Sequence, residues 1–139
     1  MKLVQVLETR DVPELIDAHL AYHLNAGVDL VIASDDGVRD ETAALLDSYV
    51  QDGRVHVVRH VSGESQDAIR TRMARMAATE LGADWVIVSA ANQFWWPRAS
   101  SLTDVLVAIP ARYTIVQALS RRFVSRPDDG RPDRKSTRL

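Results

Sequence analysis

Short apolar runs alternate with longer segments in which apolar residues recur at helical spacing, from the start of the chain to about residue 90. Runs of roughly four to eight mostly apolar residues, bounded by turn-forming residues, are typical of strands that are buried on both faces. We therefore predict strands at residues 3–7, 28–33, 55–58 and 85–88.

The intervening segments carry the signals of amphipathic helices. Ile16, Leu20 and Leu24, for example, recur every four residues and therefore share one helix face. Each segment begins with a residue suited to a helix N-terminus, a proline in the first turn or an aspartate or serine cap, and each ends at a glycine. The three predicted helices lie between Pro13 and Gly27, between Asp40 and Gly53, and between Ser65 and Gly82.

This alternation predicts an α/β fold of the Rossmann-like kind, in which a mostly parallel sheet carries helices on both faces. We expect the strands at 28–33 and 85–88 to lie in the centre of the sheet, because they are nearly continuously apolar. Beyond Pro97 the pattern predicts a short helix at 102–109 and a further strand at 113–119. Proline, glycine, aspartate and arginine dominate from residue 125 onwards, so we expect residues 126–139 to be disordered.

Composition and charge narrow the class of protein. The chain is 46% hydrophobic and 26% charged, as is usual for a globular domain, and it has no apolar stretch long enough for a transmembrane segment. Its net charge of −2 argues against a nucleic-acid binder, although residues 121–139 hold seven Arg or Lys and only three Asp. The absence of cysteine excludes disulfides and thiolate metal sites and fits a reducing compartment, so we expect a cytoplasmic protein.

Three segments that follow predicted strands should lie together, because ligands of open α/β sheets bind beyond the carboxyl ends of the strands. These segments are residues 8–11, 34–40 and 89–96. Asp35 could accept hydrogen bonds from a base or a ribose, although an aspartate in such a turn more often caps its own backbone. Trp95 and Trp96 could stack on a sugar, or they could pack beneath a loop.

Two further groups of residues have a functional and a structural interpretation. His19 and His23 are one helical turn apart and could bind zinc, but no suitable third ligand is evident nearby and both could simply flank the core. The row Arg70, Arg72 and Arg75 could be a phosphate-binding patch or the solvated face of a helix. The chain contains neither a Gly-x-Gly-x-x-Gly fingerprint nor a P-loop, which argues against a dinucleotide-binding enzyme.

Several segments, taken in order, resemble glycosyltransferases of the family 2 type. Residues 14–27, which end in Ala-Tyr-His-Leu-Asn-Ala-Gly, are similar to the W-x-x-Y-H-x-x-x-G helix of that family, and residues 34–42 are similar to its D-N-G-S-T-D-G-T turn. The expected order continues through residues 53–55, Gln66, residues 82–86, and the Phe-Trp-Trp-Pro of residues 94–97, which matches the end of a bacterial D-A-D-E-F-W-W-P motif. The resemblance covers about residues 3–98.

The resemblance implies a GT-A fold that binds a nucleoside-diphosphate sugar and transfers the sugar to an acceptor, here unknown. Asp35 would match the family's carboxylate near the base. The family's Asp-x-Asp motif would reach the ribose and a Mn²⁺ or Mg²⁺ ion on the diphosphate, where the metal offsets charge on the leaving phosphate. The donor-binding residues implied in this chain are Glu8, Arg10, Asp35, Asp36, Gln66, Ala90, Asn92, Gln93, Trp95 and Trp96.

The chain departs from the family at the metal motif, where it has Ala90, Ala91, Asn92 and Gln93. Hard divalent cations prefer carboxylate ligands, so only Asn92 remains as a weak metal candidate and we expect poor binding of Mn²⁺ or Mg²⁺. Family members carry the acceptor site and the general base in a later half. From the resemblance we expect that half to be missing after about Leu119, and the ending at 134–139 resembles translated adaptor sequence.

We therefore expect residues 1–120 to form an incomplete donor-binding domain and residues 121–139 to form a basic tail. A chain of this kind should bind a nucleoside-diphosphate sugar but show weak or no transfer activity. The alternative is a non-catalytic module on the same fold that binds a nucleotide, a glycan or a partner protein.

Overall fold

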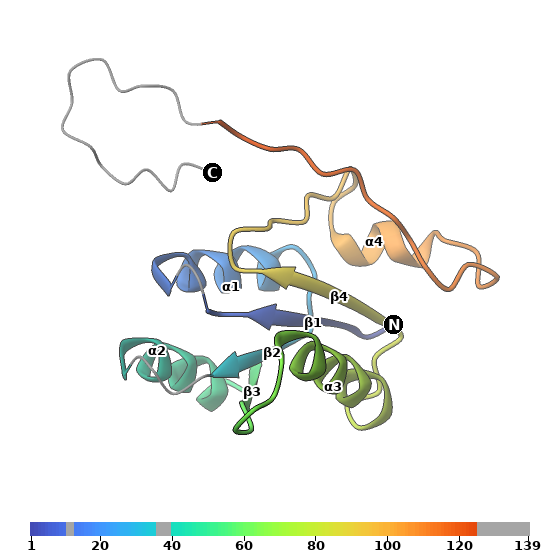
Figure 1. The fold of residues 1–139 in the computed structure, drawn as a ribbon. Helices are drawn as coiled ribbons and strands as arrows, with labels where there is room; N and C mark the ends of the chain where they lie inside the picture. Colours follow the sequence, from blue (N-terminus) through green and yellow to red (C-terminus); the bar gives the residue numbers. More distant parts are fainter. Residues whose placement is uncertain (11–12, 36–39, 125–139) are drawn as a thin grey trace, which may run out of the picture. The chain divides into compact units, whose positions relative to one another are not determined.

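The described residues contain four strands that form one all-parallel sheet (Figure 1). The computed structural model of the chain describes residues 1–10, 13–35 and 40–124. The strands are β1 (Leu3–Glu8), β2 (Leu30–Asp35), β3 (Val55–Arg59) and β4 (Trp85–Ala90), arranged in the order β3-β2-β1-β4. Because every pair is parallel, the carboxyl ends of all four strands lie along one edge of the sheet.

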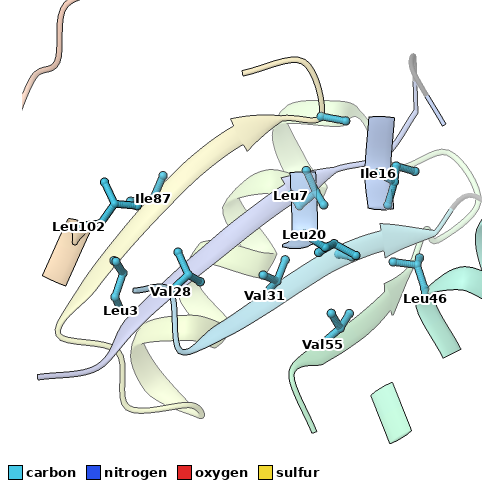
Figure 2. Close-up of a cluster of buried hydrophobic side chains, with 12 residues drawn as sticks. Leu3, Leu7, Ile16, Leu20, Val28, Val31, Leu46, Val55, Ile87 and Leu102 are labelled. Atoms are coloured by element: carbon cyan, nitrogen blue, oxygen red, sulfur yellow. The ribbon is translucent and has the colours of Figure 1, made fainter. Parts of the chain in front are cut away.

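Helices cover both faces of this sheet, as the sequence predicts. The helical elements are the 3₁₀ turn η1 (Pro13–Leu15) and the helices α1 (Ile16–Asn25), α2 (Asp40–Gln51), α3 (Gln66–Thr79) and α4 (Leu102–Val107). Side chains of α1, α2 and α4, among them Leu20, Leu46 and Leu102, pack with the sheet in one buried cluster (Figure 2). Helix α3 packs on the opposite face through Ile69 and Met73.

Strand β1 shows why a nearly continuous apolar run indicates a strand that is buried on both faces. Leu3 and Leu7 belong to the cluster on the α1 face, whereas Val4 and Val6 belong to the cluster on the α3 face, and all four are fully buried. Each such side chain contributes roughly 1.5–3 kcal/mol relative to an exposed one.

The predicted helix ends are also found. The Ser65 hydroxyl caps α3 by accepting a hydrogen bond from the backbone N–H of Ala68 at 3.1 Å. Gly27 follows α1 with a φ of 109°, a backbone conformation that side chains disfavour. The sequence signals for these boundaries are local, and they are therefore read correctly without the tertiary structure.

The predicted place of the last strand is wrong. We expected β2 and β4 to be central, but β1 and β2 hold the centre and β4 pairs only with β1 among the described residues. The edge position agrees with the exposure of Val88, which is 37% exposed next to a buried Ile87. An apolar run reports that a strand is largely buried but does not report which strands flank it.

The predicted strand at 113–119 is not present. Residues 113–124 contain no helix or strand, and side chains such as Ile115 and Leu119 are 85% and 96% exposed. A strand needs a neighbour to pair its backbone groups and to cover its apolar side chains, and composition alone supplies neither. The chain divides into a unit at Met1–Ile109, which holds the sheet, and a second unit from Pro110 onwards. The expected disorder at 126–139 lies outside the described residues.

No helix in the described part of the chain is long and apolar enough to cross a membrane.

Candidate functional site

A pocket lies where the strand order of the sheet reverses. The chain runs from β1 to β2 and β3 on one side, then returns to place β4 on the other side of β1. Such a switch point opens a crevice at the carboxyl ends of the two strands and is the usual ligand site of open α/β sheets. The pocket has a volume of about 290 Å³ and is lined by Glu8, Arg10, Gln66, Arg70, Ala90, Ala91 and Asn92.

Five of the residues implied by the resemblance meet in this pocket. Their positions span the chain from the end of β1, through the first turn of α3, to the end of β4 and the turn beyond it. The register of the sheet explains the meeting, because Glu8 lies directly opposite Ala90 in the parallel pair. The five residues are Glu8, Arg10, Gln66, Ala90 and Asn92.

The described residues that line the pocket carry more positive than negative charge. The Arg70 guanidinium donates from Nε to Glu8 Oε1 at 2.7 Å and from Nη1 to Asp67 Oδ1 at 2.8 Å. Arg10 is exposed and makes no ion pair within the described residues. Among the described residues, two arginines and one glutamate line the pocket, so this part of its lining has a net charge of +1.

The turn after β4 is closed by two hydrogen bonds between Ala90 and Gln93. The Gln93 side-chain oxygen accepts from the backbone N–H of Ala90 at 3.0 Å, and the Gln93 N–H donates to the Ala90 carbonyl at 3.0 Å. Gln93 therefore serves the turn and does not line the pocket, whereas Asn92 is exposed and does.

The residues of the pocket do not suit a divalent metal ion. Of the described residues that line it, only Glu8 carries a carboxylate, and that carboxylate is already paired with Arg70. Across the described residues, no group of three or more His, Cys, Asp or Glu side chains could hold a metal ion. Mn²⁺ and Mg²⁺ need several oxygen ligands with negative charge, and a single amide oxygen from Asn92 does not provide them.

A buried polar network beside the pocket involves both histidines of α1. His19 is fully buried, with its Nδ1 3.0 Å from the Ala91 carbonyl and its Nε2 3.0 Å from Gln5 Nε2. Since a carbonyl can only accept, Nδ1 carries the proton and Nε2 accepts from the Gln5 amide, which also donates to Ser89 Oγ at 2.7 Å.

His23 is held in the same form. Its Nε2 accepts from the Trp95 backbone N–H at 3.1 Å, and its Nδ1 donates to the His19 carbonyl at 2.9 Å. Burial, with a smaller contribution from His23, lowers the pKa of His19 to about 3, and burial also lowers the pKa of His23. Both rings are therefore neutral and use both nitrogens, which leaves no lone pair for zinc, and the structural interpretation of the two histidines is correct.

The hydrogen bonds of this network hold the turn after β4 against α1. Besides the bonds from His19 and His23, the Tyr22 hydroxyl donates to the Trp95 carbonyl at 3.1 Å. The Phe94 ring lies against both histidine rings, with centroids 5.2 and 5.5 Å away. The sequence pattern does not predict this role for the two histidines. A glutamine inside an apolar strand, at Gln5, is the signal that could have suggested a buried polar partner.

The other predicted residues that the structure describes, Asp35, Trp95 and Trp96, do not line the pocket. Asp35 is buried at the end of β2, on the same edge of the sheet, and does not line the pocket. Asp36 lies outside the described residues. Trp95 is half-buried against the core cluster, which is the packing alternative, whereas Trp96 is 84% exposed.

The arginine row on α3 divides between roles. Arg70 lines the pocket, but Arg72 donates to both carboxylate oxygens of Glu64 at 2.8 Å, and Arg75 is exposed. The row is therefore not one phosphate patch, because successive residues of a helix point in different directions.

No known protein family, curated protein or solved structure matches the chain. The α/β class accordingly rests on the sheet and its helices, and the candidate site rests on the pocket.

Proposed function

We propose that the pocket at the carboxyl ends of β1 and β4 binds the nucleoside-diphosphate part of a sugar donor, in a domain of the family 2 glycosyltransferase type. The observation that carries this proposal is the convergence of residues from 8 to 92 on one pocket at the switch point of a parallel sheet. Five of those residues are ones that the resemblance implies for donor binding.

The chemistry of the lining agrees with such a ligand. Arg10 and Arg70 offer N–H groups to phosphate oxygens, and Glu8 and Asn92 offer acceptors to ribose hydroxyls. At about 290 Å³ the pocket is at the small end of ligand sites, so it would hold the ribose and phosphates rather than a whole nucleotide sugar. Asp35, on the same edge, is the proposed contact for the base.

Calorimetry with UDP and GDP, each in EDTA and in Mn²⁺, tests this proposal. Asn92→Trp should weaken nucleotide binding by roughly tenfold or more, because the indole would fill the pocket that the exposed Asn92 borders. Gln51→Trp, at the exposed end of α2, is the matched control and should leave binding unchanged. If the folded wild-type chain bound neither UDP nor GDP, the proposal would be refuted.

The second candidate is a module on the same fold that binds without catalysis. The neutral residues at the metal motif favour the module. In family 2 enzymes this motif has carboxylates, which hold the metal ion that offsets charge on the leaving phosphate. Measuring sugar release from UDP- and GDP-sugars separates the two candidates. Turnover would support the enzyme and would overturn the non-catalytic module.

A further inference from the structure

We propose that the pocket binds the phosphate groups of its ligand directly through Arg10 and Arg70, without a divalent metal ion. The identity of the ligand as a nucleoside diphosphate rests on the proposed function, whereas the anion site rests on the charges of the pocket itself. Asn92, the metal candidate in the lining, does not suit a divalent metal ion. If the ligand binds here, another positive group must therefore neutralise its phosphates.

The sign of the pocket charge decides between an anion and a cation. With Ala90 and Asn92 the described lining has two arginines and one carboxylate, and is positive. With aspartates at these two positions it would carry three carboxylates against two arginines and would be negative. The first lining attracts phosphate, and the second attracts a cation that can in turn hold phosphate.

The two arginines are placed differently and act differently. Arg10 is exposed and unpaired within the described residues, so its guanidinium is available to a ligand. Arg70 presents Nε and Nη2 to Glu8 Oε1, each at 2.7 Å, which is the side of the guanidinium that binds a phosphate with two N–H groups. Glu8 therefore occupies the position that a phosphate would take on Arg70.

This arrangement makes Glu8 an internal competitor of the anion. Its side chain is only 18% exposed, so its charge is less screened by water than that of Asp67, the other partner of Arg70, which is 89% exposed. Removal of the Glu8 charge should free one edge of Arg70 and raise the affinity for an anion. A site in which Glu8 held a metal ion or was needed to bind the ligand would show the opposite change.

Calorimetry with inorganic pyrophosphate in EDTA tests the anion site without a nucleoside. Glu8→Gln, which keeps the size of the side chain, should strengthen binding by roughly threefold to tenfold. Arg10→Ala should weaken binding by roughly tenfold or more. Arg75→Ala, which removes an exposed arginine of α3 outside the pocket, is the matched control and should change binding little.

The triple variant Ala90→Asp, Asn92→Asp, Gln93→Glu tests the same idea from the other side. It should lose pyrophosphate and UDP binding in EDTA and regain both when Mn²⁺ is added, because its pocket is negative. Glutamate can replace Gln93 in the turn, since its oxygen can still accept from the Ala90 N–H.

The outcomes separate this inference from the proposed function. Wild-type binding of UDP only in Mn²⁺, or equal pyrophosphate binding by wild type and Arg10→Ala, would overturn the inference while leaving the nucleotide site in place. Arginine-dependent binding of pyrophosphate in EDTA together with no binding of UDP or GDP would support the anion site and overturn the proposed function. Weaker pyrophosphate binding by Glu8→Gln would also overturn the inference, because it would make Glu8 a ligand-binding group.

Discussion

At the scale of single residues, the two histidines of α1 show how polar side chains can organise an apolar core. His19 and His23 are both fully buried, and each donates from Nδ1 and accepts at Nε2. Protonation of either ring would turn the accepting nitrogen into a donor that faces another N–H group. Burial and this hydrogen bonding therefore tie the neutral form of both histidines to the folded state.

We expect these histidines to make folding stability depend on pH. The folded-state pKa of His19, about 3, is below its ordinary value of 6.5, and that of His23 is also lowered. Between pH 6.5 and about pH 3 the unfolded chain takes up protons on these histidines that the folded chain does not. Their contribution to stability is therefore fully present above pH 6.5 and is lost as the pH decreases. Through His19 alone, the free energy of unfolding should decrease by about 1.4 kcal/mol for each pH unit below 6.5.

Urea unfolding at pH 7 and pH 5 measures this effect. The wild-type chain should lose about 2 kcal/mol from His19 across this interval. His19→Gln should be less stable at pH 7 but should lose less on acidification, whereas His56→Gln, at an exposed position of β3, should keep the wild-type dependence. An equal loss in His19→Gln and the wild type would show that His19 does not titrate with unfolding.

At the scale of elements, the short helix α4 depends on the end of α1 for its position. The Leu102 N–H donates to the Ala26 carbonyl at 2.7 Å, and the Thr103 hydroxyl donates to the Gly27 carbonyl at 2.8 Å. A six-residue helix has little stability of its own, so these bonds and the buried Leu102 hold it. The close approach requires a residue without a side chain at position 27.

Substitution of Gly27 should therefore cost more than substitution of a glycine in open space. A Cβ at position 27 would lie 2.9 Å from Thr103 Oγ1 and would also strain a backbone with a φ of 109°. Gly27→Ala should lower the free energy of unfolding by about 2–3 kcal/mol, and Gly82→Ala, where the backbone is strained but no atom is near, by about 1 kcal/mol.

Thermal and urea unfolding of the two variants would measure this difference. An equal loss of stability would mean that the backbone conformation accounts for the whole effect and that the contact with Thr103 contributes nothing.

At the scale of the whole molecule, the sheet, its helices and the pocket all belong to the unit at Met1–Ile109. The described residues that follow it have large exposed apolar side chains, among them Leu119 and Phe123 at 96% and 76%. Burial of side chains in two clusters should protect the first unit from proteases. The described residues 113–124 have no secondary structure that would give such protection.

Limited digestion with trypsin should show this division. We expect the first cuts to fall after Arg121 or Arg122, which are exposed and outside any helix or strand, or farther along the basic residues at 126–139. The arginines of α3 should be cut much later, because helical backbone must open before a protease can bind it. Mass spectrometry of the early fragments is the measurement, and early cleavage within α3 would place the boundary elsewhere.

The sequence by itself determined the elements and the edge of the sheet at which the residues of the candidate site lie. Apolar spacing depends on residues two to four positions apart, so it identified β1 to β4 and α1 to α4. Most of the predicted ends lie within about two residues of the observed ends. The rule that parallel strands end together then brought Glu8, Arg10 and Asn92 to one edge without any knowledge of the pairing.

Only the tertiary structure decided the partners. The ion pair of Glu8 with Arg70 and the bond of His19 to Ala91 join residues 62 and 72 positions apart, and local spacing carries no information on such contacts. The same limit explains the edge position of β4 and the absence of a strand at 113–119, because both depend on which neighbours a segment finds. Local periodicity specifies how a segment folds, and the packing of distant segments specifies the charge and shape of the site they build.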